Sequence, residues 1–163
     1  MEESSIDMIR IIAEEGVPKM STTEQAVRAV FDAINDRDLE AIRGLVTDDF
    51  IDHGAPPGLV PPGPDGYIAV LKFVTGVLDI RYEVHEVVAG GDLVAVRATG
   101  HGLLRSNHLG FPATGKPYAM ASMHLYRGEG GRLAEHWGVR DELSALYQAG
   151  ALTPPPLPVL SAT

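Results

Sequence analysis

The chain has 163 residues, a formal net charge of −9 and an isoelectric point near 5.0. Hydrophobic residues make up 45% and charged residues 21%, which is the balance of one soluble globular domain. The acidic charge disfavours nucleic acid and anionic membranes as partners. Because the chain has no cysteine, disulfides, thiolate metal sites and cysteine nucleophiles are excluded.

The chain divides into three parts by composition. Residues 1–20 form an N-terminal extension, predicted to be a short helix or an arm, because apolar residues recur at helical spacing. Residues 21–152 form the folded domain, and residues 153–163 form a proline-rich tail. Arg10 interrupts the apolar run near the start, so we expect neither a signal peptide nor a membrane span, and a cytoplasmic location.

The first half of the domain is predicted to be helical. Ser21 and Glu24 form a capping box, followed by an apolar helix face that ends at Asn35 and Asp36. A shorter helix follows up to Val46. Residues 48–66 contain five prolines and four glycines, which predicts a long loop, and another helix is expected over residues 65–76.

The second half is predicted to be β. Four strands are expected, separated by glycine-rich turns and one longer loop, and a helix ends the domain; the strands cover residues 80–89, 93–99, 117–127 and 132–139, and the helix 141–148. Helices followed by a mostly antiparallel sheet define an α+β fold. A curved sheet wrapped around the N-terminal helices would form a central pocket, which suits a small molecule.

Four segments, in this order, resemble one known family. They read DDFIDHGAPPGLVPPGPDG, VVAGGDLVAVRATGHG, FPATGK and RLAEHWGVRDELSALYQAGA. Together they are similar to the SnoaL-like polyketide (ester) cyclases, which are cone-shaped α+β barrels of the nuclear-transport-factor type. The resemblance covers roughly residues 24–151.

The resemblance implies a cyclase of polyketide-like intermediates in secondary metabolism, as in antibiotic biosynthesis. Such an enzyme closes a ring by an intramolecular aldol reaction, with general acid/base catalysis and without cofactor or metal. It implies an apolar polycyclic substrate and a homodimer. No HxH, HxxxH or HExxH spacing that would indicate a metal site is present.

The family's catalytic positions carry over with one large departure. His124 matches the pocket histidine of the third strand, and His136 matches the histidine before the tryptophan. The aspartate that serves the aldol cyclases as general acid/base is Gly138 here. Asp52 stands where the family has an asparagine, so the carboxylate is expected to have moved to another wall of the cavity. Asp52 or His124 would then be the acid or base.

Several further residues are assigned to the predicted site. His101 matches a histidine at the end of the second strand and would hold the developing oxyanion together with His136. Ser122 replaces a polar amide of the family. Glu135 is a further acid/base candidate. The residues expected to bind substrate are Phe31, Phe50, His53, Tyr67, Met120, Ser122 and Trp137.

Strand alternation orders these residues into faces. Met120, Ser122 and His124 share one face of their strand. On the next strand His136 and Gly138 share a face, while Glu135 and Trp137 share the other, and the resemblance favours His136 inward.

Alternatives remain at this point. Glu135 would face a dimer partner if it lies on the convex side, and Asp141 is explained as a helix cap. Arg97 and Arg140 either orient a substrate carbonyl or carboxylate, or are ordinary paired charges. An epoxide-opening cyclase or hydrolase would use Asp52 or Glu135 with His101. A binding protein without catalysis is the third reading, which Gly138 favours.

Overall fold

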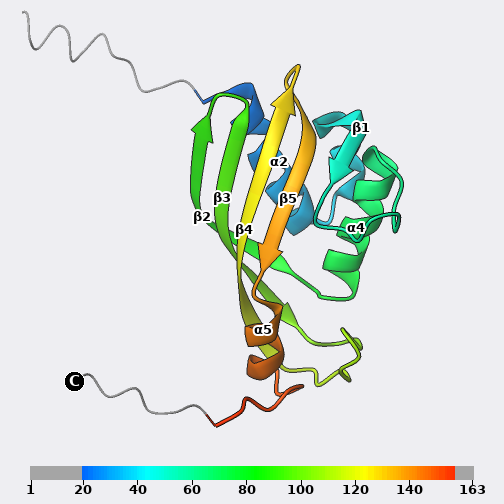
Figure 1. Ribbon diagram of the computed structural model, residues 1–163, viewed down its shortest axis with the longest axis vertical. Coiled ribbons are helices and arrows are strands. Elements are labelled where there is room, and N and C mark those ends of the chain that lie inside the picture. The colour runs from blue at the N-terminus through cyan, green and yellow to red at the C-terminus, as the bar shows by residue number, and fades with distance from the viewer. Residues whose placement is uncertain (1–19, 157–163) are drawn as a thin grey trace, which may run out of the picture.

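The computed structural model describes residues 20–156, so the helix or arm predicted within residues 1–20 lies outside the described residues except for Met20. A curved five-stranded sheet packs with its concave face against α2 (Thr22–Asp36), and α4 (Pro64–Gly76) lies beside β1 (Figure 1). The short helix α5 (Glu142–Gln148) follows the last strand below the sheet. The predicted α+β fold is confirmed.

Helix α2 begins where the capping box predicts. Ser21 Oγ accepts a hydrogen bond of 3.0 Å from the Glu24 backbone N–H. The helix buries Val27, Val30 and Phe31 against the sheet and ends at Arg37, which adopts a left-handed conformation with φ of 64°. A single 3₁₀ turn, η1 (Leu39–Ala41), leads into the short helix α3 (Ile42–Leu45).

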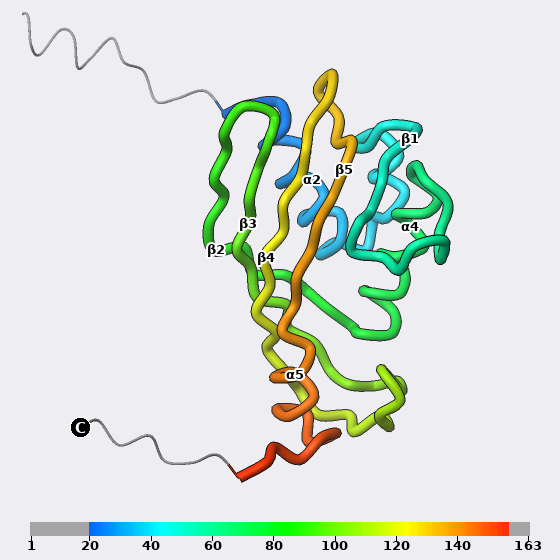
Figure 2. Tube along the Cα trace, viewed as in Figure 1, coloured from blue at the N-terminus to red at the C-terminus, as the bar shows by residue number. Residues whose placement is uncertain are grey.

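The strands are arranged in the order β1-β5-β4-β3-β2, and Figure 2 allows the chain to be followed through them. Neighbouring strands are antiparallel except for β1 and β5, which pair in parallel. Their bounds are β1 Val46–Asp52, β2 Arg81–Gly90, β3 Leu93–Leu103, β4 Pro117–Glu129 and β5 Arg132–Arg140. Strand β5 therefore lies between β1, which comes from the first half of the domain, and β4, which comes from the second half.

Two predicted boundaries were wrong. Residues 48–52 were assigned to the long loop, but they belong to strand β1, because the prolines start only at Pro56 and Val46 and Phe50 bury their side chains. Strand β3 continues through Leu103 instead of ending at Thr99, since residues 100–103 pair with β4. The loop between β1 and α4 is therefore limited to residues 53–63.

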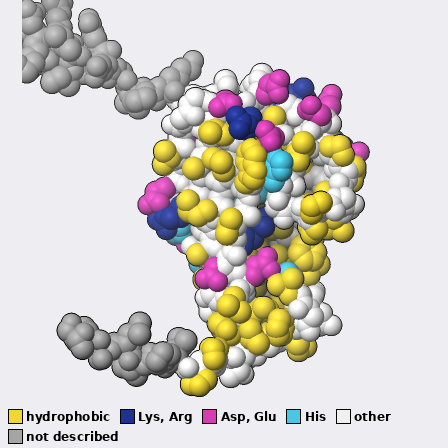
Figure 3. All heavy atoms as spheres, viewed as in Figure 1, with side chains coloured by type: hydrophobic (Ala, Val, Ile, Leu, Met, Phe, Trp, Pro, Cys, Tyr) yellow, Lys and Arg dark blue, Asp and Glu magenta, His cyan; other side chains and the backbone are white. Residues whose placement is uncertain are grey.

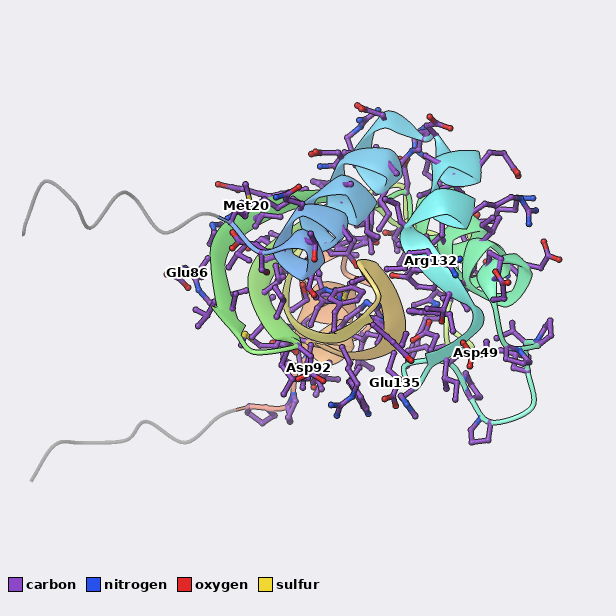
Figure 4. All side chains as sticks on the ribbon, turned by 90° about the horizontal axis from the view of Figure 1, so that it is seen from above. Met20, Asp49, Glu86, Asp92, Arg132 and Glu135 are labelled. Atoms are coloured by element: carbon purple, nitrogen blue, oxygen red, sulfur yellow. The ribbon has the colours of Figure 1, made fainter. Side chains whose placement is uncertain are left out.

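The core lies on the concave face of the sheet. Seen from above in Figure 4, the sheet curls around the side chains that point inward from it. Along β4 every second residue is buried, from Tyr118 through Met120, Ser122 and His124 to Tyr126, as the alternation predicted. In residues 20–156 no helix is long and apolar enough to cross a bilayer.

The Ser21 cap gives a direct test of the N-terminal boundary. We expect Ser21→Ala to lower the free energy of unfolding by about 1 kcal/mol, because the Glu24 N–H loses its acceptor. Urea denaturation measures the change. Thr22→Ala, at the exposed neighbouring position, is the control, and equal stability of the two variants would contradict the assigned cap.

Candidate active site

Four buried polar side chains form one continuous hydrogen-bonded chain across the concave face. Asp52 Oδ1 lies 2.8 Å from His136 Nδ1, and His136 Nε2 lies 3.0 Å from His124 Nδ1. His124 Nε2 lies 3.1 Å from Ser122 Oγ. Ser122, His124 and His136 are at most 4% exposed, and the Asp52 side chain is 3% exposed. We call these four residues the relay.

Three strands position the relay. The parallel register of β1 and β5 sets Asp52 beside His136, and the antiparallel register of β4 and β5 sets His124 beside Gly138. A register shift between β4 and β5 adds one residue, Ala134, to β5. Such a bulge lets Leu133 and His136 both point inward although they are three residues apart.

Aromatic rings enclose the relay on the helix side. The edge of Phe31 meets His124 with ring centroids 5.3 Å apart, and Tyr126 stacks on His136 at 4.5 Å. The Tyr67 and Tyr126 hydroxyls lie 3.0 Å apart, and burial raises the pKa of both, so both remain neutral. These rings fill much of the concave face.

Two of the openings that border this interior lie near its ends. A cavity of about 10 Å³, enough for one water molecule, lies where Met120 and Tyr118 approach α5. A cleft of about 310 Å³ lies under the loop of residues 53–63, and Asp52 is among its lining residues. The carboxylate end of the relay therefore borders the cleft.

The charges of the relay follow from burial and contact. Burial lowers the pKa of His124 well below its usual value, and the charges of His136 and Arg140 act in the same direction. Burial also lowers the pKa of His136, although Asp52 opposes this. Burial raises the pKa of Asp52, but hydrogen bonds from His136 and Gly54 outweigh it, and the net pKa is lowered. Near neutral pH the relay is thus one carboxylate with two neutral imidazoles.

This charge state fixes where the protons are. The carboxylate accepts from His136 Nδ1–H, so His136 Nε2 is an acceptor and His124 must donate from Nδ1. His124 Nε2 then accepts from the Ser122 hydroxyl. When one proton is added, His136 becomes an imidazolium, His124 donates from Nε2, and Ser122 donates to Ala98 O, 3.1 Å away. The relay can therefore accept a proton at one end and hold the charge at the other.

Gly138 provides the space that this arrangement needs. A Cβ at position 138 would lie 3.1 Å from His136 Cε1, 3.2 Å from His136 Nε2 and 3.4 Å from His124 Nδ1. A side chain here would push against the contact between the two imidazoles. The close contact between the two histidines therefore requires that position 138 carries no side chain, which excludes the aspartate of the aldol cyclases.

Three predicted site residues lie on the outer face of the sheet instead. Glu135 accepts from Arg127 Nε at 3.0 Å and bonds His53 Nε2 at 2.8 Å, while His53 stacks on Trp137 with ring centroids 4.6 Å apart. Figure 4 shows Glu135 on the outside of the curled sheet. Strand alternation separates Glu135 and Trp137 from the relay, whereas His53 lines the same cleft as Asp52.

His101 is also outside the relay. Its side chain is 52% exposed and bonds Glu83 at 3.1 Å, because β3 alternation turns it to the outer face. Phe31, Tyr67 and Met120 are placed on the concave face, and Phe50 packs on Tyr67 at 4.6 Å.

Sequence reasoning did not assign Tyr126 to the site and left the role of Arg140 open. Tyr126 follows His124 by two residues and stacks on His136. Arg140 follows Gly138 by two residues, and its Nε donates to the Tyr82 hydroxyl at 3.3 Å. The period of two along each strand is the signal that identifies both. Over residues 20–156 no group of three or more acidic or histidine side chains is placed to hold a metal ion.

A family model described as SnoaL-like polyketide cyclase matches residues 24–149. The chain belongs to the SnoaL-like polyketide cyclase family. The match starts in α2 and ends directly after α5, so it spans the whole relay. No curated protein sequence matches the chain.

Solved structures share the fold of this SnoaL-like domain. IdmH from Streptomyces antibioticus is 32% identical, with a TM-score of 0.68, and the match covers 78% of this chain and 98% of IdmH. TsrD from Streptomyces laurentii is 25% identical, with a TM-score of 0.70, and the match covers 80% of this chain and 96% of TsrD. AclR from Streptomyces galilaeus, at 21% identity and a TM-score of 0.68 over 84% of this chain and 89% of AclR, shares the fold.

The lowered pKa values of His124 and His136 predict how stability depends on pH. Below the unfolded pKa near 6.5 the unfolded chain binds protons that the folded relay does not, so stability falls as pH decreases toward the folded values. We expect a loss of about 1.4 kcal/mol per pH unit for each histidine in that window. Urea denaturation between about pH 6.5 and pH 5 measures the slope. His124→Gln should reduce it, and His101→Gln should not; equal slopes would contradict the assignment.

The role of Gly138 as a spacer is tested by Gly138→Ala. The added methyl group should lower the free energy of unfolding by about 1–3 kcal/mol, the usual cost of overpacking, and shift the imidazole ¹⁵N resonances of the histidine pair. Gly90→Ala, at a strand glycine with open space around it, is the matched control. Unchanged imidazole resonances in Gly138→Ala would show that the space is not needed.

Proposed function

We propose that the chain is a cofactor-independent cyclase that closes a ring in a polyketide-like intermediate by aldol-type general acid/base catalysis. His124 is the base, and the observation that carries the proposal is the buried chain from Asp52 through His136 to His124. A neutral imidazole backed by a carboxylate through a second imidazole can take a proton from carbon without leaving a charge beside the substrate.

The reaction balances within the relay. Ser122 turns its hydroxyl hydrogen from His124 Nε2 to Ala98 O, which frees the Nε2 lone pair. A substrate C–H bond next to a carbonyl breaks, the proton goes to Nε2, and the electron pair stays on the substrate as an enolate. His124 passes its Nδ1 proton to His136 Nε2. The enolate carbon attacks a second carbonyl of the same molecule, and a C–C bond forms. The resulting alkoxide takes the proton back from Nε2, and His136 returns the Nδ1 proton to His124.

Asp52 reduces the free-energy cost of this transfer, because it opposes the effect of burial on the pKa of His136. Protonation creates an imidazolium at His136, 2.8 Å from a carboxylate that is already ionised. Burial strengthens the attraction between the two charges and also costs desolvation, which further hydrogen bonds offset in part; Gly54 N–H donates to Asp52 Oδ1 at 2.9 Å. This role is similar to that of the carboxylate in a catalytic triad, which orients a histidine and stabilises its imidazolium form.

Family membership and IdmH support a cyclase. IdmH, 32% identical to this chain, carries a provisional description as a polyketide cyclase. Epoxide opening has less support, because it needs a protonated acid; the pKa of Asp52 is lowered, and Glu135 and His101 lie on the outer face. A binding protein without catalysis would not need three ionisable groups in its core, since burying them costs free energy.

A polyketide-type probe tests the proposal. A synthetic aromatic β-ketoester with a free ketone is incubated in D₂O, and mass spectrometry follows deuterium uptake next to the carbonyl while chromatography follows ring closure. We expect His124→Gln and Asp52→Asn to lower both rates by about 100-fold or more, because the base or its supporting charge is lost.

The controls are Glu135→Gln and His101→Gln, which change outer-face residues of similar chemistry. We expect both to retain the wild-type rates within about twofold. Wild-type rates in His124→Gln and Asp52→Asn would rule out the proposed base. Reduced rates in all four variants would point to a general loss of folding, which thermal unfolding would reveal.

A further inference from the structure

Arg140 brings a positive charge to the inner end of the relay. It lies beside Ser122 in the register of β4 and β5 and follows Gly138 on the same face of β5. Its Nε–H donates to the Tyr82 hydroxyl at 3.3 Å. The guanidinium is mostly buried, and it acts on the pKa values of both relay histidines and of Asp52.

This arginine lacks the partner that buried arginines usually have. Of the nine arginines within residues 20–156, seven form ion pairs with carboxylates; these are Arg28, Arg37, Arg43, Arg97, Arg105, Arg127 and Arg132. Arg81 also lacks a carboxylate, but it is exposed and bonds the Asn35 carbonyl. Arg140 is the interior exception in this part of the chain.

The unused donors of Arg140 are not fully buried. Its two terminal nitrogens make no hydrogen bond with the described residues. Within residues 20–156, Thr47 Oγ1 is the one fully buried side-chain nitrogen or oxygen that has no hydrogen-bond partner. The terminal nitrogens of Arg140 also have no partner, so they must retain some exposed surface. A guanidinium with one donor fixed by Tyr82 and the others free can bind a planar group through two parallel hydrogen bonds.

We propose that Arg140 binds a planar oxyanion of the substrate, either a carboxylate or the enolate formed when His124 removes the proton. The substrate class is therefore a compound with such a group next to the reacting carbon. This inference deepens the proposed function, because it names the group that the substrate presents at the same site. The fixed charge would be complementary to the negative oxygen that develops there.

The position of Arg140 favours this ligand. Proton removal at His124 Nε2 takes place on the Ser122 side of the imidazole, and Arg140 is the cross-strand neighbour of Ser122. In an enolate, the oxygen is bonded to the carbon next to the one that loses the proton. His124 would therefore meet the carbon that loses its proton, and Arg140 would meet the oxygen on which the negative charge develops.

A matched series of small probes tests the proposal without turnover. Equilibrium binding is measured by calorimetry for 4-nitrobenzoate, for 4-nitrophenolate as an enolate analogue, and for neutral 4-nitrobenzamide. We expect wild-type protein to prefer at least one anion over the amide by about tenfold, as for a charge-assisted hydrogen bond. The absorbance of nitrophenol reports independently whether the bound form is ionised.

The variants are Arg140→Gln, Arg140→Lys and Arg81→Gln. Arg140→Gln should abolish the preference, Arg140→Lys should keep a reduced preference, and Arg81→Gln, which removes an exposed charge, should keep the wild-type ratio. The ratio between anion and amide is insensitive to partial unfolding, and Arg140→Lys serves if Arg140→Gln does not fold.

The two anions distinguish the sources of the oxyanion. Preference for 4-nitrobenzoate indicates a permanent substrate carboxylate, and preference for 4-nitrophenolate indicates an enolate. Equal affinity of the wild-type protein for all three probes, including no binding of any, overturns the proposal, as does a preference that survives Arg140→Gln. His124→Gln should retain the preference, so loss of turnover and loss of anion binding are separable.

Discussion

Asp52 reaches His136 because β1 pairs in parallel with β5, and the directions of the other hydrogen bonds in the relay follow from that one contact. A carboxylate on the concave face would be costly to bury alone. Here it accepts from His136 and from the Gly54 backbone, which fixes the tautomer of His136 and, through it, the direction of the next bond to His124. The short strand β1 therefore determines the protonation pattern of residues two strands away.

The contact between the imidazoles of His124 and His136 also depends on the missing side chain at Gly138. Gly138 is the cross-strand neighbour of His124, and any Cβ there would approach both rings. On the outer face of the same strands, the charged and aromatic residues Glu135 and Trp137 pair with partners of their own. Figure 3 shows hydrophobic side chains along this face with a histidine among them, and Met123 and Val139 are exposed there. The homodimer implied by the resemblance stays a prediction.

Sequence periodicity was sufficient where one strand or one helix decides the outcome. The cap at Ser21 and the sharing of one face by alternate residues of β4 and β5 follow from local patterns, while the inward direction of His136 was expected from the family resemblance. The pairing of β1 with β5 could not be predicted in this way, because parallel partners lie about 85 residues apart and the strand is short and adjoins a proline-rich loop. The outward direction of His101 has a related cause: β3 runs farther than its glycines suggest, and alternation turns His101 to the outer face.

The position of the carboxylate also determines the charge that the substrate meets. An aspartate at position 138 would stand two residues from Arg140 on the same face of β5, close enough to pair with the guanidinium and neutralise it. With glycine there and the carboxylate supplied by Asp52, the negative charge lies beyond His136, and His124 separates it from the place where a proton would be removed. The guanidinium of Arg140 then remains free for an anion. Moving the carboxylate therefore preserves a supported base and leaves a cation beside it, which together suit deprotonation of a carbonyl compound.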